Sequence, residues 1–283
     1  MMILDWRLYN HALLLNTPPH VSADVNIQDV KKILKERKAF MARWTSGFDK
    51  YPKSEWWYCV KDSPIKLSEL TSKQRYRINK GLKNIFVFQI KKDDIINYLG
   101  DIFEIAEDCF ANYPSQYRPN MCDVMREYKK LLLDEGSIGS LWGCKDRVTG
   151  VFCGFSICIE NDNWINLAVV KVLSDYQKKE VNAALVFTIC EHYFNQGNIL
   201  YISDGERNIR HQTAYQDFLV RVLGFKYAYC KLNVIYNTWI YYLVKILYPY
   251  RNVIKHLSSW NSYLYNLYCV LKQEEIVRSF VIK

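Results

Sequence analysis

The chain has 283 residues, 50% of them apolar, and a formal net charge of +9 at pH 7. This composition supports a substantial core and excludes a disordered chain, and the length fits one large domain or two small ones. The positive charge predicts an anionic partner such as a nucleotide phosphate, tRNA, an anionic lipid or an acidic glycan, and charge alone does not choose among them.

The cysteines and the apolar runs narrow the class of protein further. Nine cysteines are scattered without a CxxC pair, which argues against a disulfide framework and against a zinc site. We expect reduced thiols in a cytoplasmic protein, most of them acting as small core residues, and no metal ion. The stretch "MMILDWRLYNHALLL" contains Asp5 and Arg7 and is not typical of a signal peptide. No uncharged apolar run reaches the roughly 18 residues that a membrane span needs.

The first half of the chain predicts alternating helices and strands. Residues up to 23 end in "NTPPHVS", a linker by composition. Thr71 and Gln74 form a capping-box signature, in which the two residues satisfy each other's amides at the start of a helix. From hydrophobic spacing and such end signals, we predict a helix over 27–44, a strand over 55–62, a helix over 71–83, a strand over 85–90, and helices over 94–111 and 122–136.

The second half predicts a meander that is followed by alternating helices and strands. Turn residues in "KDRVTG" and "ENDN" separate segments with period-two alternation, which indicates antiparallel strands. A helix between strands indicates a parallel crossover inside a mixed sheet. The predicted elements are three strands between 139 and 173, a helix over 175–196, a strand over 198–203, a helix over 211–223, a strand over 226–236 and a helical tail over 237–283.

The order of elements over 139–236 resembles the C-terminal half of the GNAT superfamily of N-acyltransferases. The resemblance is carried by "LAVVKVL", "DYQKKEVNAALVFTICEHYF", "ILYISD" and "TAYQDFLVRVLGFKYAYCKL", whose helix ends in Gly224-Phe225 before a final strand. The helix in "LSELTSKQRYRINKGLKN" is also similar to the Lys/Arg-rich helix of the Fem-type peptidoglycan aminoacyl transferases, which are built from GNAT-like units. The resemblance implies an α/β fold with a GNAT-like mixed, mostly antiparallel sheet flanked by helices, and a C-terminal helical tail.

The same resemblance divides the chain into three segments. Residues 139–236 are the GNAT-like core, and residues 237–283 are a helical tail rich in aromatic and basic side chains. Residues 1–138 are an N-terminal α/β region, which is either part of a second GNAT-like unit or a family-specific cap.

The resemblance implies a binding site for acyl-CoA at the start of the long helix. GNAT enzymes place glycines there, because bare backbone N–H groups at a helix N-terminus bind the pyrophosphate of coenzyme A. The equivalent stretch here is "QKKEVN", which contains no glycine. We predict that lysine charge replaces part of this cradle and that the cofactor-binding residues are Gln177, Lys178, Lys179 and Asn182.

Polar residues after the strand end at 203 are candidates for chemistry on the acceptor. Ligands favour the carboxyl ends of parallel strands, and a carboxylate or imidazole with a tuned pKa can take the proton of an acceptor amine. The candidate catalytic residues are Asp204, Glu206, His211 and Tyr215, of which the tyrosine stands in for the general acid of many GNAT enzymes. The candidate substrate-binding residues are Arg207, Asn208 and Arg210. The alternative is that "DGERN" is a solvated polar turn.

Three further features have two interpretations each. The basic helix over 71–83 either follows a phosphate-rich partner or presents a solvated face. Trp56 and Trp57 either form a stacking platform or belong in part to the core, because adjacent residues on a strand point in opposite directions. The tail, in which Trp and Tyr alternate with basic residues, either lies at a membrane surface or packs on its own sheet.

These features predict an enzyme that transfers an acyl group from acyl-CoA, such as acetyl-CoA, to an amine of a small molecule or sugar nucleotide. Backbone N–H groups of the strand over 165–172 would polarise the acyl carbonyl. A Fem-like transferase that uses aminoacyl-tRNA in cell-wall or surface-polysaccharide synthesis is the first alternative, and a non-catalytic binding module is the second. We expect a cytoplasmic protein, either free or in peripheral contact with the inner face of the membrane through its tail.

Overall fold

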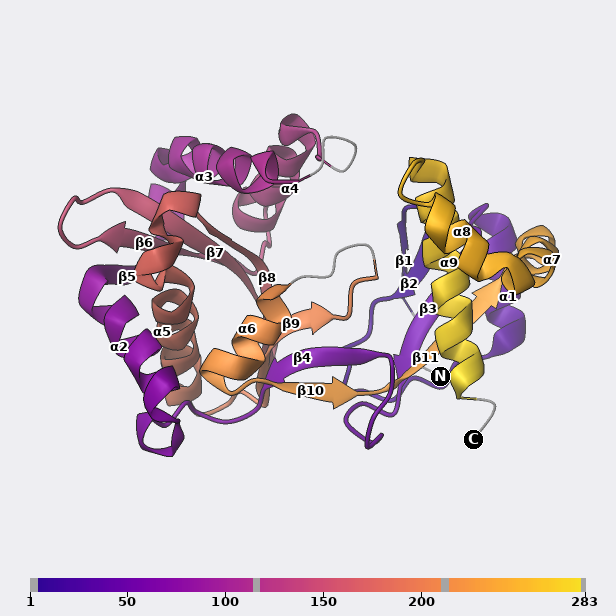
Figure 1. The fold of residues 1–283 in the computed structure, drawn as a ribbon, viewed down its shortest axis with the longest axis horizontal. Coiled ribbons are helices and arrows are strands. Elements are labelled where there is room, and N and C mark those ends of the chain that lie inside the picture. The colour runs from indigo at the N-terminus through magenta and orange to yellow at the C-terminus, as the bar shows by residue number, and fades with distance from the viewer. Residues whose placement is uncertain (1–4, 114–117, 210–213, 281–283) are drawn as a thin grey trace. The chain divides into compact units, whose positions relative to one another are not determined.

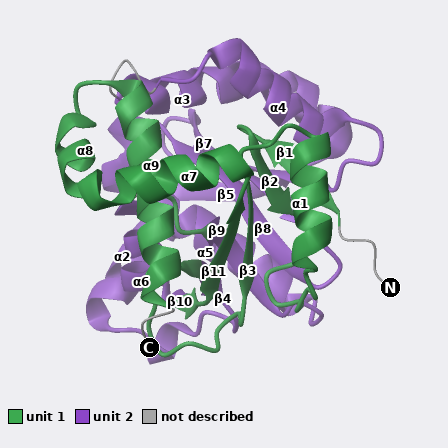
Figure 2. Ribbon diagram, turned by 90° about the vertical axis from the view of Figure 1, so that its right-hand side faces the viewer, with its two compact units in different colours: residues 1–58, 206–212, 227–283 green, residues 59–205, 213–226 purple. Residues whose placement is uncertain are grey.

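The computed structural model describes residues 5–113, 118–209 and 214–280. The chain divides into two compact units, and both are discontinuous in sequence (Figure 2). Unit 1 comprises residues 1–58, 206–212 and 227–283, and unit 2 comprises residues 59–205 and 213–226. The three-segment division after residues 138 and 236 stays a prediction about folding units.

The larger of the two described sheets has seven strands, most of which belong to unit 2 (Figure 1). Across the sheet the order is β10 (Lys226–Tyr229), β4 (Trp57–Lys61), β9 (Tyr201–Glu206), β8 (Trp164–Val172), β7 (Phe152–Glu160), β6 (Gly139–Asp146) and β5 (Ile85–Ile90). Strands β5 to β8 are antiparallel neighbours, whereas β8 and β9 are parallel. The predicted meander with a parallel crossover is therefore confirmed.

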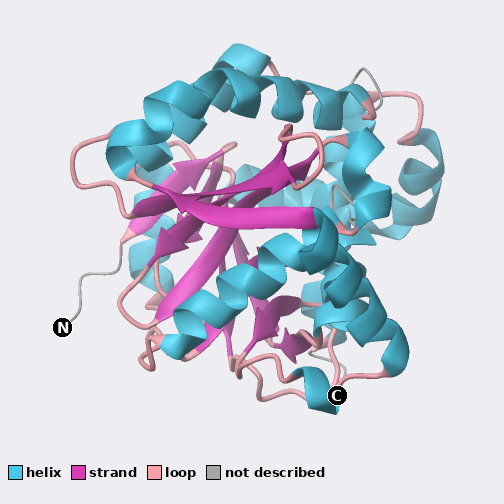
Figure 3. Ribbon diagram, turned by 90° about the vertical axis from the view of Figure 1, so that its left-hand side faces the viewer, coloured by secondary structure: helices cyan, strands magenta, loops and turns pink. Residues whose placement is uncertain are grey.

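Helices cover both faces of this sheet within unit 2 (Figures 1 and 3). The helices α3 (Leu99–Ala111) and α4 (Met121–Leu133) pack on one face of the sheet. The helix α5 (Val181–Asn195) packs on the other face, and α2 (Ser72–Asn84) packs against α5. Alternation along β6 places side chains on both faces. Leu141 joins the apolar cluster formed with α3 and α4, whereas Ser140 and Trp142 contact Tyr193 of α5.

The helix α5 is the central helix of unit 2. Nine of its fifteen residues are buried, which is typical of a helix enclosed on most sides. A 3-10 helix (Ser174–Lys179) joins β8 to it. The helix α2 approaches its first turn closely at Gly81, where an added Cβ would lie 2.6 Å from the carbonyl oxygen of Glu180. Glycine at this position therefore sets the distance between the two helices.

Unit 1 contains a four-stranded sheet and the helical tail. The sheet order is β1 (Trp6–Tyr9), β2 (Ala12–Leu15), β3 (Met41–Ser46) and β11 (Lys231–Tyr236), with β2 parallel to β3 and the other neighbours antiparallel. The helices of unit 1 are α1 (Ile27–Glu36), α7 (Thr238–Leu247), α8 (Arg251–Leu257) and α9 (Ser262–Ser279). Apolar side chains of α1, among them Val30 and Leu34, form a core with Leu13 of β2. The predicted helical tail is confirmed.

Local end signals predicted several elements well. At the start of α2, the amide of Thr71 donates to the Gln74 side chain and the amide of Gln74 donates to the Thr71 hydroxyl, as the capping box requires. Strand β5 covers the whole predicted range 85–90. Seven of the nine cysteines are buried, in agreement with their predicted role in the core.

The helix predicted over 27–44 is wrong in its C-terminal part. Helix α1 ends at Glu36, Lys38 adopts the left-handed conformation with φ of 51°, and the chain continues as strand β3 from Met41. Met41 and Trp44 fit a helical spacing, but β3 pairs with β11 from the far end of the chain. Pairing with a distant strand overrode the local pattern.

Other boundaries also differ from the prediction. The strand predicted over 226–236 is two strands, because β10 and β11 join different sheets and Cys230 lies between them. The first part of the helix predicted over 94–111 is a 3-10 helix, in which Ile96 is 62% exposed. Strand β9 lies three residues later than predicted, and α6 is described over Ala214–Leu223.

Candidate active site

The parallel pairing of β8 and β9 ends close to the predicted strand end at 203. The ladder joins Trp164 to Tyr201, Ile165 to Ile202 and Asn166 to Ser203. Among the described residues no ladder pair of these two strands follows, so Asp204 is the first residue of β9 beyond the ladder. Ligands of open α/β sheets bind at such carboxyl ends of parallel strands. We therefore take this place as the candidate site.

Strand β8 carries a bulge just beyond the same point. Its ladder with β7 pairs Leu167 with Cys158 and Val169 with Ile157, so Ala168 has no opposite residue. A bulge bends a strand and takes one residue out of the ladder. Among the described residues β8 also has no β9 partner beyond Asn166, and this is the side of the strand on which the sequence predicts that backbone N–H groups polarise an acyl carbonyl.

Asp204 is a half-buried carboxyl group at the end of this ladder. Burial raises its pKa to about 7, and the hydrogen bond with Gln216 lowers the pKa only in part. The ordinary pKa of an aspartate is about 3.9, so the shift favours the protonated form. A pKa near the working pH suits a general base, which must accept a proton and release it again.

Tyr215, in the first turn of α6, places a hydroxyl group near Asp204. The oxygen is buried and makes no hydrogen bond within the described part of the chain. Burial raises the pKa of this phenol well above its ordinary value, and the Asp204 carboxylate raises it further. The hydroxyl therefore keeps its proton at neutral pH. A buried hydroxyl without a partner costs free energy, and a bound ligand would supply the missing partner.

Neighbouring side chains fix the Asp204 segment in place. Gln216 is buried and hydrogen-bonds the carboxyl group. Gly205 has φ of +87°, which favours glycine, and its amide donates to the Ser203 hydroxyl at 3.0 Å. Sequence reasoning missed Gln216. Its position next to Tyr215 on the predicted helix is the signal that could have identified it.

Glu206, the other predicted carboxylate of β9, belongs to unit 1 and has a cationic partner. It forms an ion pair with Arg43, whose side chain is only 19% exposed. Both residues line a cavity of about 150 Å³ within unit 1, together with Tyr58. Glu206 is therefore paired within unit 1, and its catalytic role stays a prediction.

Arg207 is also engaged within unit 1. It donates to the backbone carbonyl and the carboxylate of Glu55, and its guanidinium lies 4.7 Å from the centre of the Trp57 ring. Trp56, by contrast, is fully buried, which confirms that one tryptophan of the pair belongs to the core. Asn208 is exposed.

Two of the predicted residues, Arg210 and His211, lie outside the described residues. The catalytic role of His211 stays a prediction, and so does substrate binding by Arg207, Asn208 and Arg210.

The predicted donor-binding residues lie on the 3-10 helix and the first turn of α5. Gln177 and Lys178 are exposed, and Asn182 is half-buried. Lys179 is engaged, because its Nζ lies 2.5 Å from Oδ2 of the buried Asp146. This ion pair and the amides and hydroxyl around the carboxylate lower the pKa of Asp146 to about 2.

The start of α5 differs from a glycine cradle in both shape and charge. Its N-cap residue, Glu180, has a left-handed backbone, and Arg77 of α2 donates to both carboxylate oxygens at 2.9 and 2.7 Å. Glu180 makes no side-chain hydrogen bond to the first turn of α5, but as an acidic N-cap residue it brings negative charge to the helix end where a pyrophosphate would bind. The close approach of α2 at Gly81 further encloses this turn.

The cations of the basic helix α2 fall into two groups. Arg77 binds Glu180, as described, and lies 5.1 Å from the centre of the Phe218 ring, while Arg75 donates to the backbone carbonyl of Leu70. Lys73 and Lys83 are exposed. The arginines therefore hold unit 2 together, and the lysines remain for solvent or for a phosphate-rich partner.

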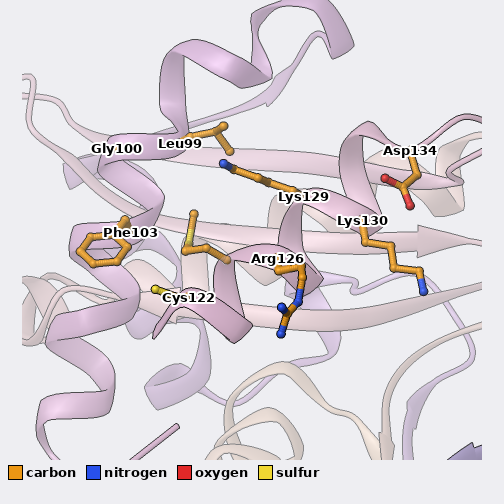
Figure 4. Close-up of a pocket in the computed structure, with 9 residues that line it drawn as sticks. Leu99, Gly100, Phe103, Cys122, Arg126, Lys129, Lys130 and Asp134 are labelled. Carbon is orange, nitrogen blue, oxygen red and sulfur yellow. The ribbon is translucent and has the colours of Figure 1, made fainter. Parts of the chain in front are cut away.

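A cavity of about 810 Å³ lies in unit 2 between α3 and α4, and none of the predicted site residues lines it (Figure 4). Leu99 and Phe103 come from α3, and Arg126, Lys129 and Lys130 come from α4. Figure 4 shows Lys129 extending toward Leu99, whereas Lys130 lies at the end near Asp134. The cavity therefore shares no lining residue with the Asp204 site.

The described ranges contain neither a cluster of metal ligands nor a helix that could span a membrane. No group of His, Cys, Asp and Glu side chains there could hold a metal ion. None of the helices described is both long enough and apolar enough to cross a bilayer.

Comparison with solved structures finds proteins with a similar arrangement of elements. The C-terminal domain of a putative lysylphosphatidylglycerol synthetase from Agrobacterium fabrum matches with a TM-score of 0.50 and 7% identity, over 81% of this chain and 79% of that chain. FemX matches with a TM-score of 0.47 and 11% identity, over 72% and 68% of the two chains. A tandem GNAT protein from the clavulanic acid biosynthesis pathway matches with a TM-score of 0.46 and 8% identity, over 80% and 75%. No protein-family model and no curated protein sequence matches the chain.

The chain therefore shares the fold of the Agrobacterium fabrum domain, in agreement with the predicted α/β architecture of a mixed sheet flanked by helices. At identities this low, the likeness concerns the fold alone, and one fold hosts many activities. The chemistry has to be argued from the residues around Asp204.

Proposed function

We propose that the protein is an acyltransferase that acylates an amine and that Asp204 is its general base. The observation that carries the proposal is a carboxyl group with a pKa of about 7, just beyond the parallel ladder, beside the buried hydroxyl of Tyr215 that has no partner among the described residues. An amine acceptor is an ammonium ion at neutral pH, and it becomes a nucleophile only after a base has taken a proton.

In the proposed reaction, the Asp204 carboxylate accepts a proton from the acceptor ammonium. The free amine then attacks the acyl carbon, while backbone N–H groups of β8 beyond Asn166 stabilise the oxyanion. The C–N bond forms and the bond to the leaving group breaks. Tyr215 donates its proton to the leaving sulfur or oxygen and regains a proton from the protonated Asp204. The Asp204 carboxylate then takes the second proton from the nitrogen, which leaves the neutral amide. Acyl donor and ammonium therefore yield an amide, the protonated leaving group and one proton, which Asp204 finally releases to solvent.

Acyl-CoA is the first candidate donor, and an amine of a small molecule or sugar nucleotide is the candidate acceptor. Gln177 and Lys178 are exposed on the 3-10 helix before α5, so they are available to the phosphates of coenzyme A. Lys179 would first have to leave Asp146, which argues that it contributes less.

An aminoacyl-tRNA is the second candidate donor, and the start of α5 favours it. The negative charge of Glu180 and the close approach of α2 at Gly81 disfavour a pyrophosphate at the turn where coenzyme A would place it. A tRNA needs no cradle at this turn, and it would account for the net charge of +9. Both donors are cytoplasmic molecules, in keeping with the predicted compartment.

Isothermal titration of the full chain separates the two donors. Binding of acetyl-CoA and coenzyme A supports the first donor, and binding of total tRNA without coenzyme A supports the second. Binding of tRNA through six or more phosphates should weaken by about 10³-fold between 50 and 200 mM salt, whereas coenzyme A binding should respond much less.

Transfer is then measured with the donor that binds and a panel of amines, by mass spectrometry of the products. The variant Asp204→Asn should bind the donor as tightly as the wild type and transfer almost nothing. If the wild type binds neither donor and acylates no amine, the chain is a non-catalytic module and the proposal is wrong.

A further inference from the structure

Helices α7 and α8 of unit 1 expose many large apolar side chains. Helix α7 buries only Ile240 and Val244, and α8 buries only Ile254. The exposed side chains in and beside these helices include Trp239 (54% exposed), Tyr242 (58%), Ile246 (66%), Tyr250 (61%), Val253 (58%), Trp260 (81%) and Tyr263 (82%). So many large exposed apolar side chains on neighbouring segments are uncommon in monomeric domains, and such concentrations mark interaction sites.

Helical spacing gathers these side chains on outward faces. In α7, Trp239, Tyr242 and Ile246 follow one another at intervals of three and four residues, which places them on one face. Val253 and Leu257 of α8 are spaced in the same way. The buried residues Ile240, Val244 and Ile254 join a core cluster of unit 1. Each helix is therefore apolar on its inner and on its outer side.

The charges around these faces have one sign. No Asp or Glu occurs between Phe218 and Gln273. Lys245 and Lys255 are exposed on α7 and α8, while Arg251 is paired with Glu275 of α9. The aromatic surface therefore carries cations but no carboxylate of its own, which makes it complementary to an anionic partner.

Contacts with neighbouring rings hold the side chain of Trp239 in place. The ring of Trp239 makes an edge contact with Phe40, with 5.3 Å between the ring centres, and His11 stacks on the other ring at 4.7 Å. Phe40 is itself 40% exposed. Trp239 is thus an exposed but positioned indole, so little conformational entropy is lost when a partner covers it.

We propose that α7 and α8, together with Trp260 and Tyr263, form a docking surface for an anionic lipid bilayer and lie parallel to it. Trp and Tyr rings favour the headgroup region, where one end of each ring is apolar and the other is wet. Lysines at such a surface keep their ammonium groups among anionic headgroups while their stems lie along apolar neighbours. The proposal is independent of acyl transfer, because it uses none of the residues around Asp204.

Vesicle flotation of the full chain tests the proposal. We expect binding to vesicles that contain phosphatidylglycerol, weak binding to phosphatidylcholine alone, a blue shift of tryptophan emission on binding, and weaker binding as salt rises. Replacing Trp239 or Ile246 by Ser should weaken binding roughly tenfold each. The double variant Lys245→Glu/Lys255→Glu should weaken it by about 25-fold or more, since each lost cation accounts for roughly fivefold.

Matched variants in unit 2 serve as controls. Lys129→Glu/Lys130→Glu changes the net charge equally on exposed positions of α4, and Val148→Ser removes an apolar side chain that is 89% exposed. Both should bind vesicles like the wild type, and so should Asp204→Asn. Circular dichroism confirms folding, and because Trp239 contacts Phe40, the freely exposed Ile246 provides the second, independent test.

Three results would overturn the proposal. Equal binding to the two kinds of vesicle would remove the anionic lipid as partner. If the charge reversals on α4 weaken vesicle binding as much as those on α7 and α8, the binding depends on the net charge of the protein and not on this surface. A dimer in sedimentation velocity that Trp239→Ser or Ile246→Ser dissociates would assign the surface to a second copy of the chain.

Discussion

Two carboxylates on strand β9, two residues apart, have opposite surroundings. Asp204, in unit 2, is taken out of water without a cation beside it among the described residues, and its pKa rises to about 7. Glu206, in unit 1, is paired with Arg43, whose guanidinium also lies 5.2 Å from the centre of the Trp56 ring. The partner of a carboxylate, more than its place on the strand, therefore decides whether the group is available for proton transfer.

The tyrosines near the two carboxylates repeat the contrast. The hydroxyl of Tyr58, in unit 1, lies 3.3 Å from the hydroxyl of Thr45, and burial and the Glu206 carboxylate raise its pKa. The hydroxyl of Tyr215, in unit 2, is buried without a described partner. One carboxylate and tyrosine pair is thus part of a satisfied network, and the other is not.

The largest expected effect is on catalysis by Asp204→Asn. We expect kcat/KM for amine acylation to fall by about 10²–10⁴, because the amide cannot accept the ammonium proton. In the wild type, kcat/KM should rise with pH through a midpoint near 7, since the base works only when it is deprotonated. The measurement is a pH series of initial rates for both proteins.

A result with wild-type rates in Asp204→Asn would remove Asp204 as the base and shift attention to His211, which lies outside the described residues. Asp62→Asn, at a half-exposed ion pair with Lys226, is the control for a lost carboxylate in unit 2. Its rates and its pH profile should match those of the wild type.

The next effect is expected from Tyr215→Phe, compared with Tyr58→Phe. Loss of the Tyr215 hydroxyl should lower kcat about 10- to 100-fold if it protonates the leaving group, and it should leave stability unchanged or slightly higher, because a buried unpaired hydroxyl is removed. Tyr58→Phe should lower stability by about 1 kcal/mol, because a hydrogen bond is lost, and leave kcat unchanged. Rates and denaturant melts of both variants make the comparison. An equal loss of stability in the two variants would show that the Tyr215 hydroxyl is hydrogen-bonded like that of Tyr58.

A smaller effect is expected in the pH dependence of stability. The pKa of Asp204 is 3.8 ordinarily and about 7 in the folded protein. Between these values the unfolded chain has released the proton that the folded chain still holds, so the free energy of unfolding falls as pH rises toward 7. A shift of this size corresponds to at most roughly 4 kcal/mol, and partial solvent access reduces it to on the order of 1–2 kcal/mol.

Asp204→Asn should abolish that loss, so its stability relative to the wild type should increase from pH 5 to pH 8. Chemical denaturation across this range measures the difference. A constant difference over the whole range would contradict the raised pKa and, with it, the main support for the general base.

The sequence predicted candidate residues at the end of β9 but could not rank them. Asp204 and Glu206 are equal candidates on paper, because each is a carboxylate near the end of a predicted strand. What separates them is contributed by Gln216 from the following helix and by Arg43 from a distant strand. No local pattern contains such partners, so only the folded chain distinguishes a desolvated carboxylate from a paired one.

The fold was predictable where its signals are local. The capping box at Thr71 and the turns of the meander determine α2 and strands β6 to β8 from neighbouring residues alone. Strand β3 was predicted as a helix, because its pairing partner β11 lies near the other end of the sequence. Elements whose stability comes from distant pairing are the ones that spacing cannot identify.

The smallest effect on activity is expected from Glu206→Gln. This variant tests the carboxylate of β9 that is paired with Arg43. The pair with Arg43 is neither fully buried nor fully exposed, with side chains 30% and 19% accessible. Exposed pairs contribute up to about 1 kcal/mol and breaking buried ones costs about 3–5 kcal/mol, so we expect a loss of roughly 1–2 kcal/mol in urea melts. Arg43 retains its contact with the Trp56 ring and with Gln273, which limits the loss. Transfer rates should stay within a factor of two of the wild type, because the proposed base is Asp204 and Glu206 is paired with Arg43. A fall in kcat/KM as large as that of Asp204→Asn would show instead that the paired carboxylate is the base.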